Sequence, residues 1–139
     1  MGFTEEARVL NDAAILTMLD AGCAMAQEMG QPQCLVIVDA SGVDLGVMRM
    51  HGAKFLAMRS ARAKAQTAAS TRAPSTNLPE GVRVAVALAT DGALTGLAGG
   101  LPIRMEGVLV GGIGVGSGSG AQDIEVAEAM LAAIGADKV

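Results

Sequence analysis

Residues 99–120 read GGLPIRMEGVLVGGIGVGSGSG, and this glycine-rich stretch decides the fold. Eleven of the nineteen glycines in the chain fall between Gly92 and Gly120. Glycine in a strand costs backbone entropy and packs poorly, so such a cluster needs a physical reason. Either the backbone bends sharply, or it lies close to a ligand, a helix or a second subunit. Two apolar runs flank Glu106-Gly107, which suits a two-residue turn, so the stretch predicts a β-hairpin.

The end of this stretch carries Gly116-x-Gly118-x-x-Ala121, a formal match to the relaxed dinucleotide-binding fingerprint. A Rossmann unit needs a second parallel strand with an acid about 20 residues further on. Only 18 residues follow Ala121, so nucleotide binding is not expected. Backbone amides before the next helix suit a carboxylate or phosphate unless Asp123 occupies that positive end. The alternative is that these glycines only allow a turn and close packing.

Turn and cap signals divide the remaining sequence into alternating helices and strands. An acidic first turn after Thr4 predicts a helix over residues 4–29. The apolar runs 34–38 and 45–50 predict a hairpin, and the alanine-rich run 53–71 predicts a second helix. The other expected elements are a helix or strand at 81–89, a strand at 94–98 and a helix at 121–134. This order predicts an α+β fold in one domain over residues 1–139, with helices on an antiparallel sheet.

Composition narrows the class of protein. Apolar residues make up 51% of the chain and charged residues 17%, while aromatic residues make up 1%. Because this balance is apolar for a small domain, we expect part of the surface to face another subunit of a homo-oligomer. The net charge of −4 and the lack of aromatic platforms argue against a nucleic-acid partner.

The lack of a targeting pattern and the spacing of the cysteines favour a reducing compartment. No run approaches 18 uninterrupted apolar residues, and Glu5, Glu6 and Arg8 stand where a signal peptide would be apolar. Cys23 and Cys34 have neither zinc nor redox-motif spacing, which favours small buried side chains. We therefore expect a cytoplasmic protein with no membrane-spanning segment.

Positive charge is concentrated in one region. Between Asp44 and Glu80 there is no acidic residue, and six of the ten Lys and Arg residues lie there. This segregation attracts anions and predicts a small anionic ligand, although a basic run also forms an ordinary solvated helix face. On a helical projection Lys64 stands apart from the other bases, among small neutral neighbours. Its ammonium group either extends past the helix edge or points into a pocket.

His51 is the only histidine and lies where the second predicted strand gives way to a helix. Functional side chains are common at such junctions. An imidazole there can act as a general base, ligate haem iron or lie in an exposed loop. Zinc catalysis is not expected, because no second histidine is present. The nine methionines are spread over every element, which favours core packing and leaves haem ligation by methionine open.

Several motifs together resemble the GlcG/HbpS-like family. They are Val38-Asp39-Ala40-Ser41-Gly42, Arg49-Met50-x-Gly52-Ala53, Lys64-Ala65-x-x-Ala68, Gly99-Gly100-Leu101-Pro102-Ile103, Ile113-Gly114-Val115 and Gln122-Asp123-x-x-x-Ala127. The match covers nearly the whole chain, and the Gly-Gly-Leu-Pro-Ile element is its most specific part. Similar domains occur at the C-terminus of some corrinoid adenosyltransferases and beside glycolate-utilisation genes.

The resemblance implies a profilin-like fold, in which helices flank a five-stranded antiparallel sheet, and assembly into oligomers. Some family members bind haem, which makes haem a candidate cofactor, and many others belong to catabolic operons. The family commonly has an acid where this chain has His51. We therefore expect a protein without the secretion signal and the histidine-rich extensions of haem-sensing relatives, and the sequence offers no Trp or Tyr to form the wall of a haem pocket.

The first hypothesis of function is a binding protein for a small anionic ligand such as haem. Arg49, Lys64 or Arg104 would pair with carboxylates, and His51 would ligate the iron. Ser117 and the Gly99-Gly100 pair are further ligand-binding candidates. We rank this hypothesis first.

The second hypothesis is a cofactor-independent lyase, isomerase or hydrolase that acts on a small organic acid. Here His51 would be the general base, Lys64 and Arg49 would bind the carboxylate, and the amides of Gly99 and Gly100 would stabilise an oxyanion. The third hypothesis is an assembly subunit without a ligand, supported by the apolar composition.

Overall fold

An antiparallel sheet forms the centre of the computed structural model, which describes residues 2–139. The strands are β1 (Cys34–Asp39), β2 (Asp44–Arg49), β3 (Gly100–Met105) and β4 (Val108–Gly116), in the order β2-β1-β4-β3. The helices are α1 (Asp12–Glu28), α2 (Ala57–Thr71), α3 (Arg83–Ala89) and α4 (Gly120–Ala133). The predicted α+β class and both hairpins are confirmed.

The expected five-stranded sheet is corrected to four strands within residues 2–139. The predicted strand at 94–98 is an irregular segment, because its backbone bonds to side chains instead of a neighbouring strand. The Thr95 amide donates to Thr67 Oγ1 at 2.9 Å, and Leu97 O accepts from the Ser75 hydroxyl. The ambiguous run 81–89 contains a short 3₁₀ turn followed by α3.

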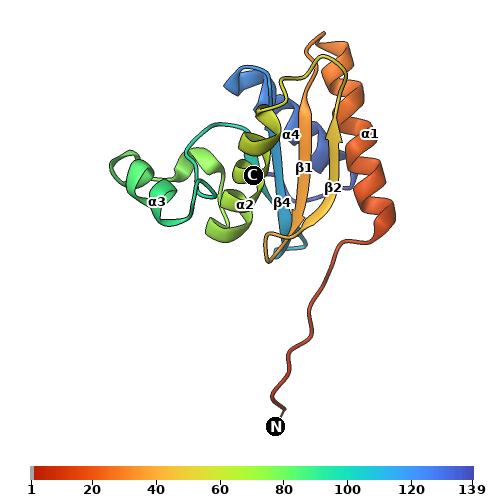
Figure 1. The fold of residues 1–139 in the computed structure, drawn as a ribbon. Helices are drawn as coiled ribbons and strands as arrows, with labels where there is room; N and C mark the ends of the chain where they lie inside the picture. Colours follow the sequence, from red (N-terminus) through yellow and green to blue (C-terminus); the bar gives the residue numbers. More distant parts are fainter. Residues whose placement is uncertain (1) are drawn as a thin grey trace.

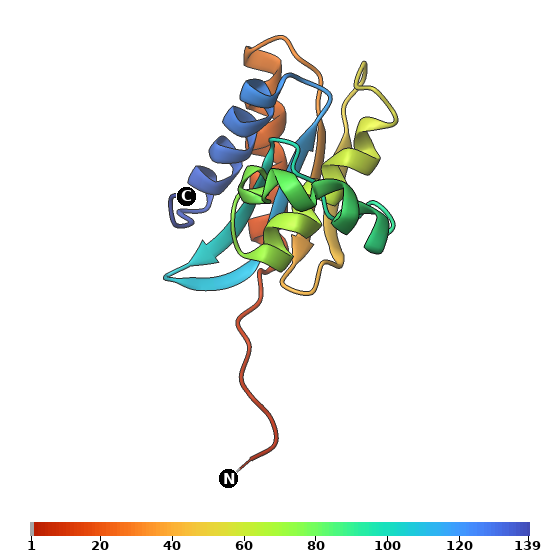
Figure 2. The same cartoon turned by 90° about the vertical axis from the view of Figure 1, so that its left-hand side faces the viewer.

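Helices cover both faces of the sheet (Figures 1 and 2). On one face, α1 and α4 close the larger core around Met18, Ile37, Ile113 and Met130, all of which are fully buried. On the other face, α2 packs its alanines on the β1 side chains at alternate positions. The molecule therefore has three layers, with the sheet in the middle.

A stripe of glycines on β4 determines how close α2 can lie. A methyl group added at Gly114 would overlap the backbone oxygen of Ala61, and one added at Gly112 would overlap that of Ala65. At Gly116 the added carbon would lie 2.9 Å from Ala57 O. The helix backbone thus packs directly on the strand backbone, which explains the glycine cluster as close helix-to-sheet packing.

Two predicted helix starts are wrong. Helix α1 begins at Asp12, because Asn11 Oδ1 caps the Ala14 amide at 2.9 Å, and Thr4 lies in an exposed arm. This arm leads away from the domain (Figures 1 and 2). Helix α2 begins at Ala57 instead of Ala53, and the residues before it form turns.

The glycine-rich stretch ends in a capped helix. Ser119 Oγ accepts from the Gln122 amide, and Gln122 Oε1 accepts from the Ser119 amide, which forms a capping box. Asp123 Oδ1 accepts from the Gly118 amide at 3.1 Å. The backbone amides that were candidates for binding an anion are therefore already bonded to side chains at the start of α4. Over residues 2–139, no helix combines the length and the apolar character needed to cross a bilayer.

Candidate functional site around His51

The strand register brings several of the predicted site residues to one end of the sheet. Arg49 pairs with Cys34 across β2 and β1, and Cys34 pairs with Gly116 across β1 and β4. Since neighbouring strands lie about 4.8 Å apart, the Cα atoms of Arg49 and Gly116 are about 10 Å apart. His51 follows Arg49, and Ser117 follows Gly116, so these residues gather at this end.

His51 lines a hollow of about 610 Å³ at the edge of the sheet. Helix α1 contributes Cys23 to its wall, and β2 and the residue after it contribute Met48 and Met50. The two methionines lie on the same face because strand side chains alternate. An imidazole, a thiol and two thioethers therefore border one hollow, between α1 and the end of β2.

The Cys23 thiol stays protonated at neutral pH. Burial raises its pKa above the ordinary value of 9.0, and the carboxylate of Asp20 raises it further. Burial also raises the pKa of Cys34, while the Arg49 guanidinium opposes that shift. Because thiolates are the good metal ligands and nucleophiles, His51 is the stronger donor in this hollow at neutral pH.

Alkylation kinetics test this assignment of the thiols. We expect Cys23 to react slowly with iodoacetamide at pH 7 and to speed up only above about pH 9, because the thiolate forms late. Mass spectrometry of the alkylated protein over a pH series gives the rate for each cysteine. Protein unfolded in guanidinium chloride is the control. Equal rates for Cys23 in folded and unfolded protein at pH 7 would show that the folded environment does not suppress the thiolate.

Lys64 lies outside this hollow, in the interior of the protein. Its ammonium group donates to Asp123 Oδ2 at 3.0 Å and to Val115 O at 2.7 Å. The Lys64 side chain is 6% exposed and that of Asp123 is 3% exposed. This buried ion pair joins α2 to the start of α4. The first and second hypotheses expected Lys64 to bind a carboxylate of the ligand or substrate, but Lys64 already binds the carboxylate of Asp123.

The Gly99-Gly100 pair makes room for this ion pair. A carbon added at Gly99 would lie 2.6 Å from Val115 O and 3.2 Å from Lys64 Nζ, and one at Gly100 would overlap Lys64 O. The Gly100 amide donates to Ser75 Oγ at 3.0 Å, so it is not a free oxyanion donor. The structure thus places these glycines around Lys64, apart from His51.

The other predicted residues are divided between faces and ends of the sheet. Arg49 alternates with Met48 and Met50, so it lies on the opposite face from the hollow. The Ser117 hydroxyl accepts from the Lys54 amide at 3.0 Å and holds the loop before α2. Arg104 pairs with Leu109 near the β3–β4 turn, at the opposite end of the sheet from His51, and its guanidinium donates to Arg72 O. Of the predicted ligand-binding set, only His51 borders the hollow.

Comparison with protein families fits this geometry. Residues 10–132 match the family model described as haem degrading protein HbpS-like. The chain belongs to the HbpS-like family. The resemblance inferred from the sequence motifs is therefore confirmed, and the match covers every strand and nearly all of α4.

Curated relatives of this HbpS-like chain are larger proteins. The corrinoid adenosyltransferase PduO of Citrobacter freundii is 31% identical over 135 residues, which is 94% of this chain and 40% of that protein. PduO of Salmonella typhimurium is 31% identical over 119 residues, 82% of this chain and 35% of that protein. The HbpS-like chain thus spans less than half of the length of these relatives.

Solved structures share the architecture. A crystal structure of a PduOC–haem complex has a TM-score of 0.87 at 27% identity and covers 94% of this chain and 98% of its own. A double mutant of HbpS from Streptomyces reticuli has a TM-score of 0.83 at 32% identity and covers 95% and 91%. ORFY from Klebsiella pneumoniae has a TM-score of 0.91 at 23% identity, which shows the fold alone.

Sequence reasoning missed one residue of the site and one buried ion pair outside it. Cys23 was interpreted as a small buried residue, although Asp20, Cys23 and Gln27 share one helix face and together border the hollow. That three- and four-residue spacing was the available signal. Asp123 was assigned to the helix dipole, and nothing local indicated that it pairs with Lys64, 59 residues earlier.

Proposed function

We propose that this protein binds haem. The edge of the haem ring would lie in the hollow between α1 and the end of β2, and His51 would be the iron ligand. The observation that carries the proposal is the position of the only histidine, which borders a hollow of about 610 Å³ with mainly apolar walls. Membership of a haem-degrading family and the fold shared with a PduOC–haem complex support it.

The residues at the hollow fit such a ligand. Protein pockets that hold organic cofactors have volumes of roughly 300–1,000 Å³, apolar walls and few polar groups. Met48, Met50 and Pro32 supply the apolar surface in a chain without Trp or Tyr, and His51 supplies the nitrogen donor. Among residues 2–139, no lysine or arginine borders the hollow, so the carboxylates of haem would remain at its open mouth, in water and near Gln27.

Bound haem would supply an iron centre whose coordination the imidazole completes. The contributions of the protein are to hold the imidazole in the turn that follows β2 and to keep the competing thiol protonated. The acid–base alternative gains no support from the geometry, because the Lys64 ammonium is used by Asp123 and the Gly100 amide by Ser75.

Hemin titration followed by absorbance tests the proposal. We expect wild-type protein to give a saturable shift of the Soret band, and His51→Ala to bind roughly 10- to 100-fold more weakly. Free imidazole at millimolar concentration should restore the spectrum of His51→Ala, because it replaces the missing donor. Rescue separates loss of a ligand from loss of structure.

A matched control uses the far end of the sheet. Arg104→Gln removes a cation that the sequence assigned to ligand carboxylates, and its titration should match that of the wild type, because Arg104 lies near the β3–β4 turn. A Soret band of hemin that does not shift when wild-type protein is present would reject haem binding. Equal binding by wild type and His51→Ala would reject the site. A parallel titration with a cobalamin tests the corrinoid that the names of the PduO relatives suggest.

A further inference from the structure

The side chain of Gln33, the residue before β1, is buried without a hydrogen-bond partner. It is completely buried, and neither its Nε2 nor its Oε1 atom bonds to any of residues 2–139. No other buried side-chain nitrogen or oxygen in the described part of the chain lacks a partner. Buried polar groups of native proteins are nearly always hydrogen-bonded, and those that bond to no protein atom bond to ordered water or an ion. Gln33 therefore points to a bound molecule in the interior.

The amide of Gln33 lies over the glycine-rich loop. A carbon added at Gly118 would lie 2.7 Å from Gln33 Nε2. The same carbon would lie 2.9 Å from Asp123 Oδ1 and from Gln122 Oε1. One nitrogen and two oxygens thus surround the place where any other residue has its side chain. Gly118 does not have a positive φ angle, so its backbone conformation does not require glycine. The space beside it does.

The chemistry of these atoms selects a neutral ligand that both donates and accepts hydrogen bonds. Asp123 Oδ1 accepts from the Gly118 amide, and Gln122 Oε1 accepts from the Ser119 amide. Each oxygen keeps a free lone pair, while Gln33 Nε2 is a donor without an acceptor. The Asp123 carboxylate would repel an anion, and the N–H side of the Gln33 amide would repel a cation. A water molecule can accept from the nitrogen and donate to both oxygens.

We propose that an ordered water lies beside Gly118, between Gln33 and the first turn of α4. It accepts a hydrogen bond from Gln33 Nε2 and donates to Asp123 Oδ1 and Gln122 Oε1. A second water donates to Gln33 Oε1. Globular proteins hold roughly one buried water per 27 residues, and each makes about three hydrogen bonds. The water beside Gly118 thereby joins the start of β1, the glycine-rich loop and α4.

The water site is adjacent to the hollow of His51 but does not depend on haem. Gln31 and Pro32 line that hollow and immediately precede Gln33. The main-chain oxygen of Gln33 accepts from the Met50 amide at 3.1 Å, so Gln33 also holds the chain just before His51. None of the three side chains that would hold the water lines the hollow. The two sites can therefore be tested separately.

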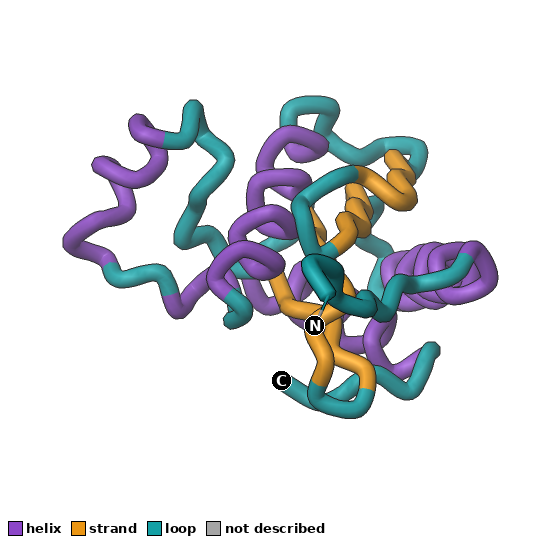
Figure 3. The backbone as a smooth tube through the Cα atoms, turned by 90° about the horizontal axis from the view of Figure 1, so that it is seen from below, coloured by secondary structure: helices purple, strands orange, loops and turns teal. Residues whose placement is uncertain are grey.

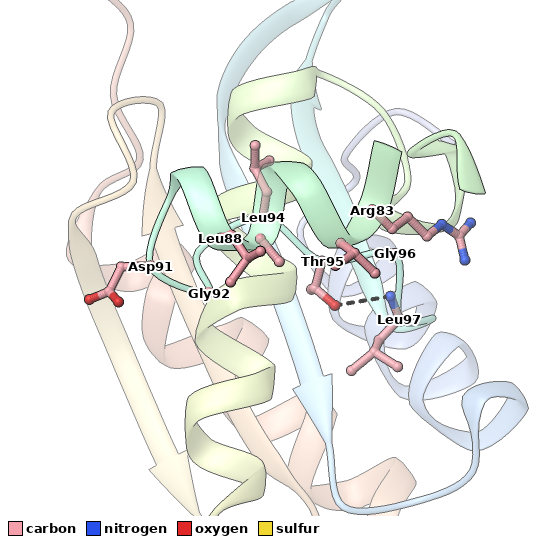
Figure 4. Close-up of a pocket in the computed structure, with 10 residues that line it drawn as sticks. Arg83, Leu88, Asp91, Gly92, Leu94, Thr95, Gly96 and Leu97 are labelled. Atoms are coloured by element: carbon pink, nitrogen blue, oxygen red, sulfur yellow. Dashed lines mark hydrogen bonds between the residues drawn. The ribbon is translucent and has the colours of Figure 1, made fainter. Parts of the chain in front are cut away.

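The hollow beside α3 shows the contrast. It has a volume of about 550 Å³ and lies in the segment that stands out from the body of the domain (Figure 3). Figure 4 shows the bond in which Thr95 Oγ1 accepts from the Leu97 amide, at 3.2 Å. The Arg83 guanidinium of that hollow donates to Leu78 O at 2.8 Å. These polar groups have protein partners, whereas the amide of Gln33 has none among residues 2–139.

Two substitutions test the water through its effect on the folding equilibrium constant. Gly118→Ala should lower this constant roughly tenfold or more, because the methyl group takes the space of the water and leaves Gln33 Nε2 without an acceptor. Gln33→Met has a similar size but no amide. In the Gln33→Met background, Gly118→Ala should cost much less, since the thioether needs no partner.

Gln33→Met alone separates a hydrated amide from an unsatisfied one. If water satisfies the amide, the folding constant of Gln33→Met should equal that of the wild type or lie below it. If nothing satisfies the amide, removing it should raise the folding constant about tenfold or more. Urea denaturation followed by circular dichroism measures both constants.

Nuclear magnetic resonance detects the water directly. We expect the side-chain amide protons of Gln33 to show cross-relaxation with a long-lived water in the wild type, and to lose it in Gly118→Ala. The matched control is Gly81→Ala, which should keep the signal, because a carbon added at Gly81 meets no atom within 4 Å. The Gln33 protons are assigned by their disappearance in Gln33→Met.

Three results would overturn the proposal. The first is wild-type protein without the water signal at Gln33. The second is a Gln33→Met variant that is about tenfold more stable than the wild type. The third is an equal cost of Gly118→Ala with Gln33 and with methionine at that position, which would show that crowding alone excludes a side chain from residue 118.

Discussion

Gly114→Ala is expected to destabilise the protein by about 3 kcal/mol or more, beyond the usual cost of overpacking a core. The added methyl group would overlap the carbonyl oxygen of Ala61 and lie 2.6 Å from the Ala65 amide nitrogen. Both atoms belong to the backbone of α2, so no side chain can rotate away. The helix would have to lift off β4, and the packing of the alanine face on β1 would be lost with it. Urea denaturation followed by circular dichroism measures the change.

Two further variants make this prediction specific. Gly81→Ala is the matched control, because a carbon added at Gly81 meets no atom within 4 Å, and its unfolding midpoint should stay near that of the wild type. Adding Ala61→Gly to Gly114→Ala should not restore stability, since the obstacle is a carbonyl group that glycine also has. Rescue by Ala61→Gly would show that side chains, and not backbones, set the distance between α2 and β4.

Asp123→Ala is expected to cost about 3–5 kcal/mol, because it leaves the Lys64 ammonium buried with only a carbonyl oxygen as partner. Both members of the pair are almost completely buried, so water cannot replace the lost carboxylate. The Gly118 amide, which donates to Asp123, would also lose its acceptor. Equilibrium unfolding of Asp123→Ala, of Lys64→Met and of the double variant Lys64→Met/Asp123→Ala gives the coupling energy between the two residues. The double variant should be more stable than the sum of the two single losses predicts.

An exposed ion pair in the same protein provides the contrast. Arg62 and Asp44 are 3.0 Å apart, but their side chains are 34% and 42% exposed. Breaking it with Arg62→Ala should cost only about 0–1 kcal/mol, and the loss should shrink with added salt. A loss for Asp123→Ala as small as that for Arg62→Ala would mean that Lys64 reaches water when its partner is removed.

The parts of the fold that sequence could predict are those specified locally. Glu106 and Gly107 both adopt positive φ angles, 51° and 80°, as a tight two-residue turn requires, and the sequence placed that turn correctly. The final helix was also found, because Gln122 and Asp123 stand in its first turn and Gly135 follows its end. The start of α1 was missed because Thr4 and Asn11 are both good caps, and only packing against the sheet selects Asn11.

The parts that could not be predicted depend on residues far apart in the chain. The environment of Lys64 was left open between solvent and a pocket, and its partner Asp123 lies in the last helix. The wall of the His51 hollow comes from α1, about thirty residues earlier. The missing fifth strand has the same cause, since the backbone at Thr95 bonds to a threonine on α2. Spacing along the chain carries no information on such pairs.

The glycine stripe on β4 also limits its own length. Alternate residues of a strand repeat about every 6.8 Å, whereas every fourth residue of a helix repeats about every 6.0 Å. The row of alternate residues on β4 and the row of every fourth residue on α2 therefore fall out of register by about 0.8 Å at each repeat. Contact between Gly112, Gly114, Gly116 and the helix already spans two repeats, and the next alternate glycine meets side chains of Gln33 and α4 instead of α2. More glycines on β4 would therefore not extend the close contact between the backbones of β4 and α2. Helix α2 could be longer without a need for more glycine in the sheet.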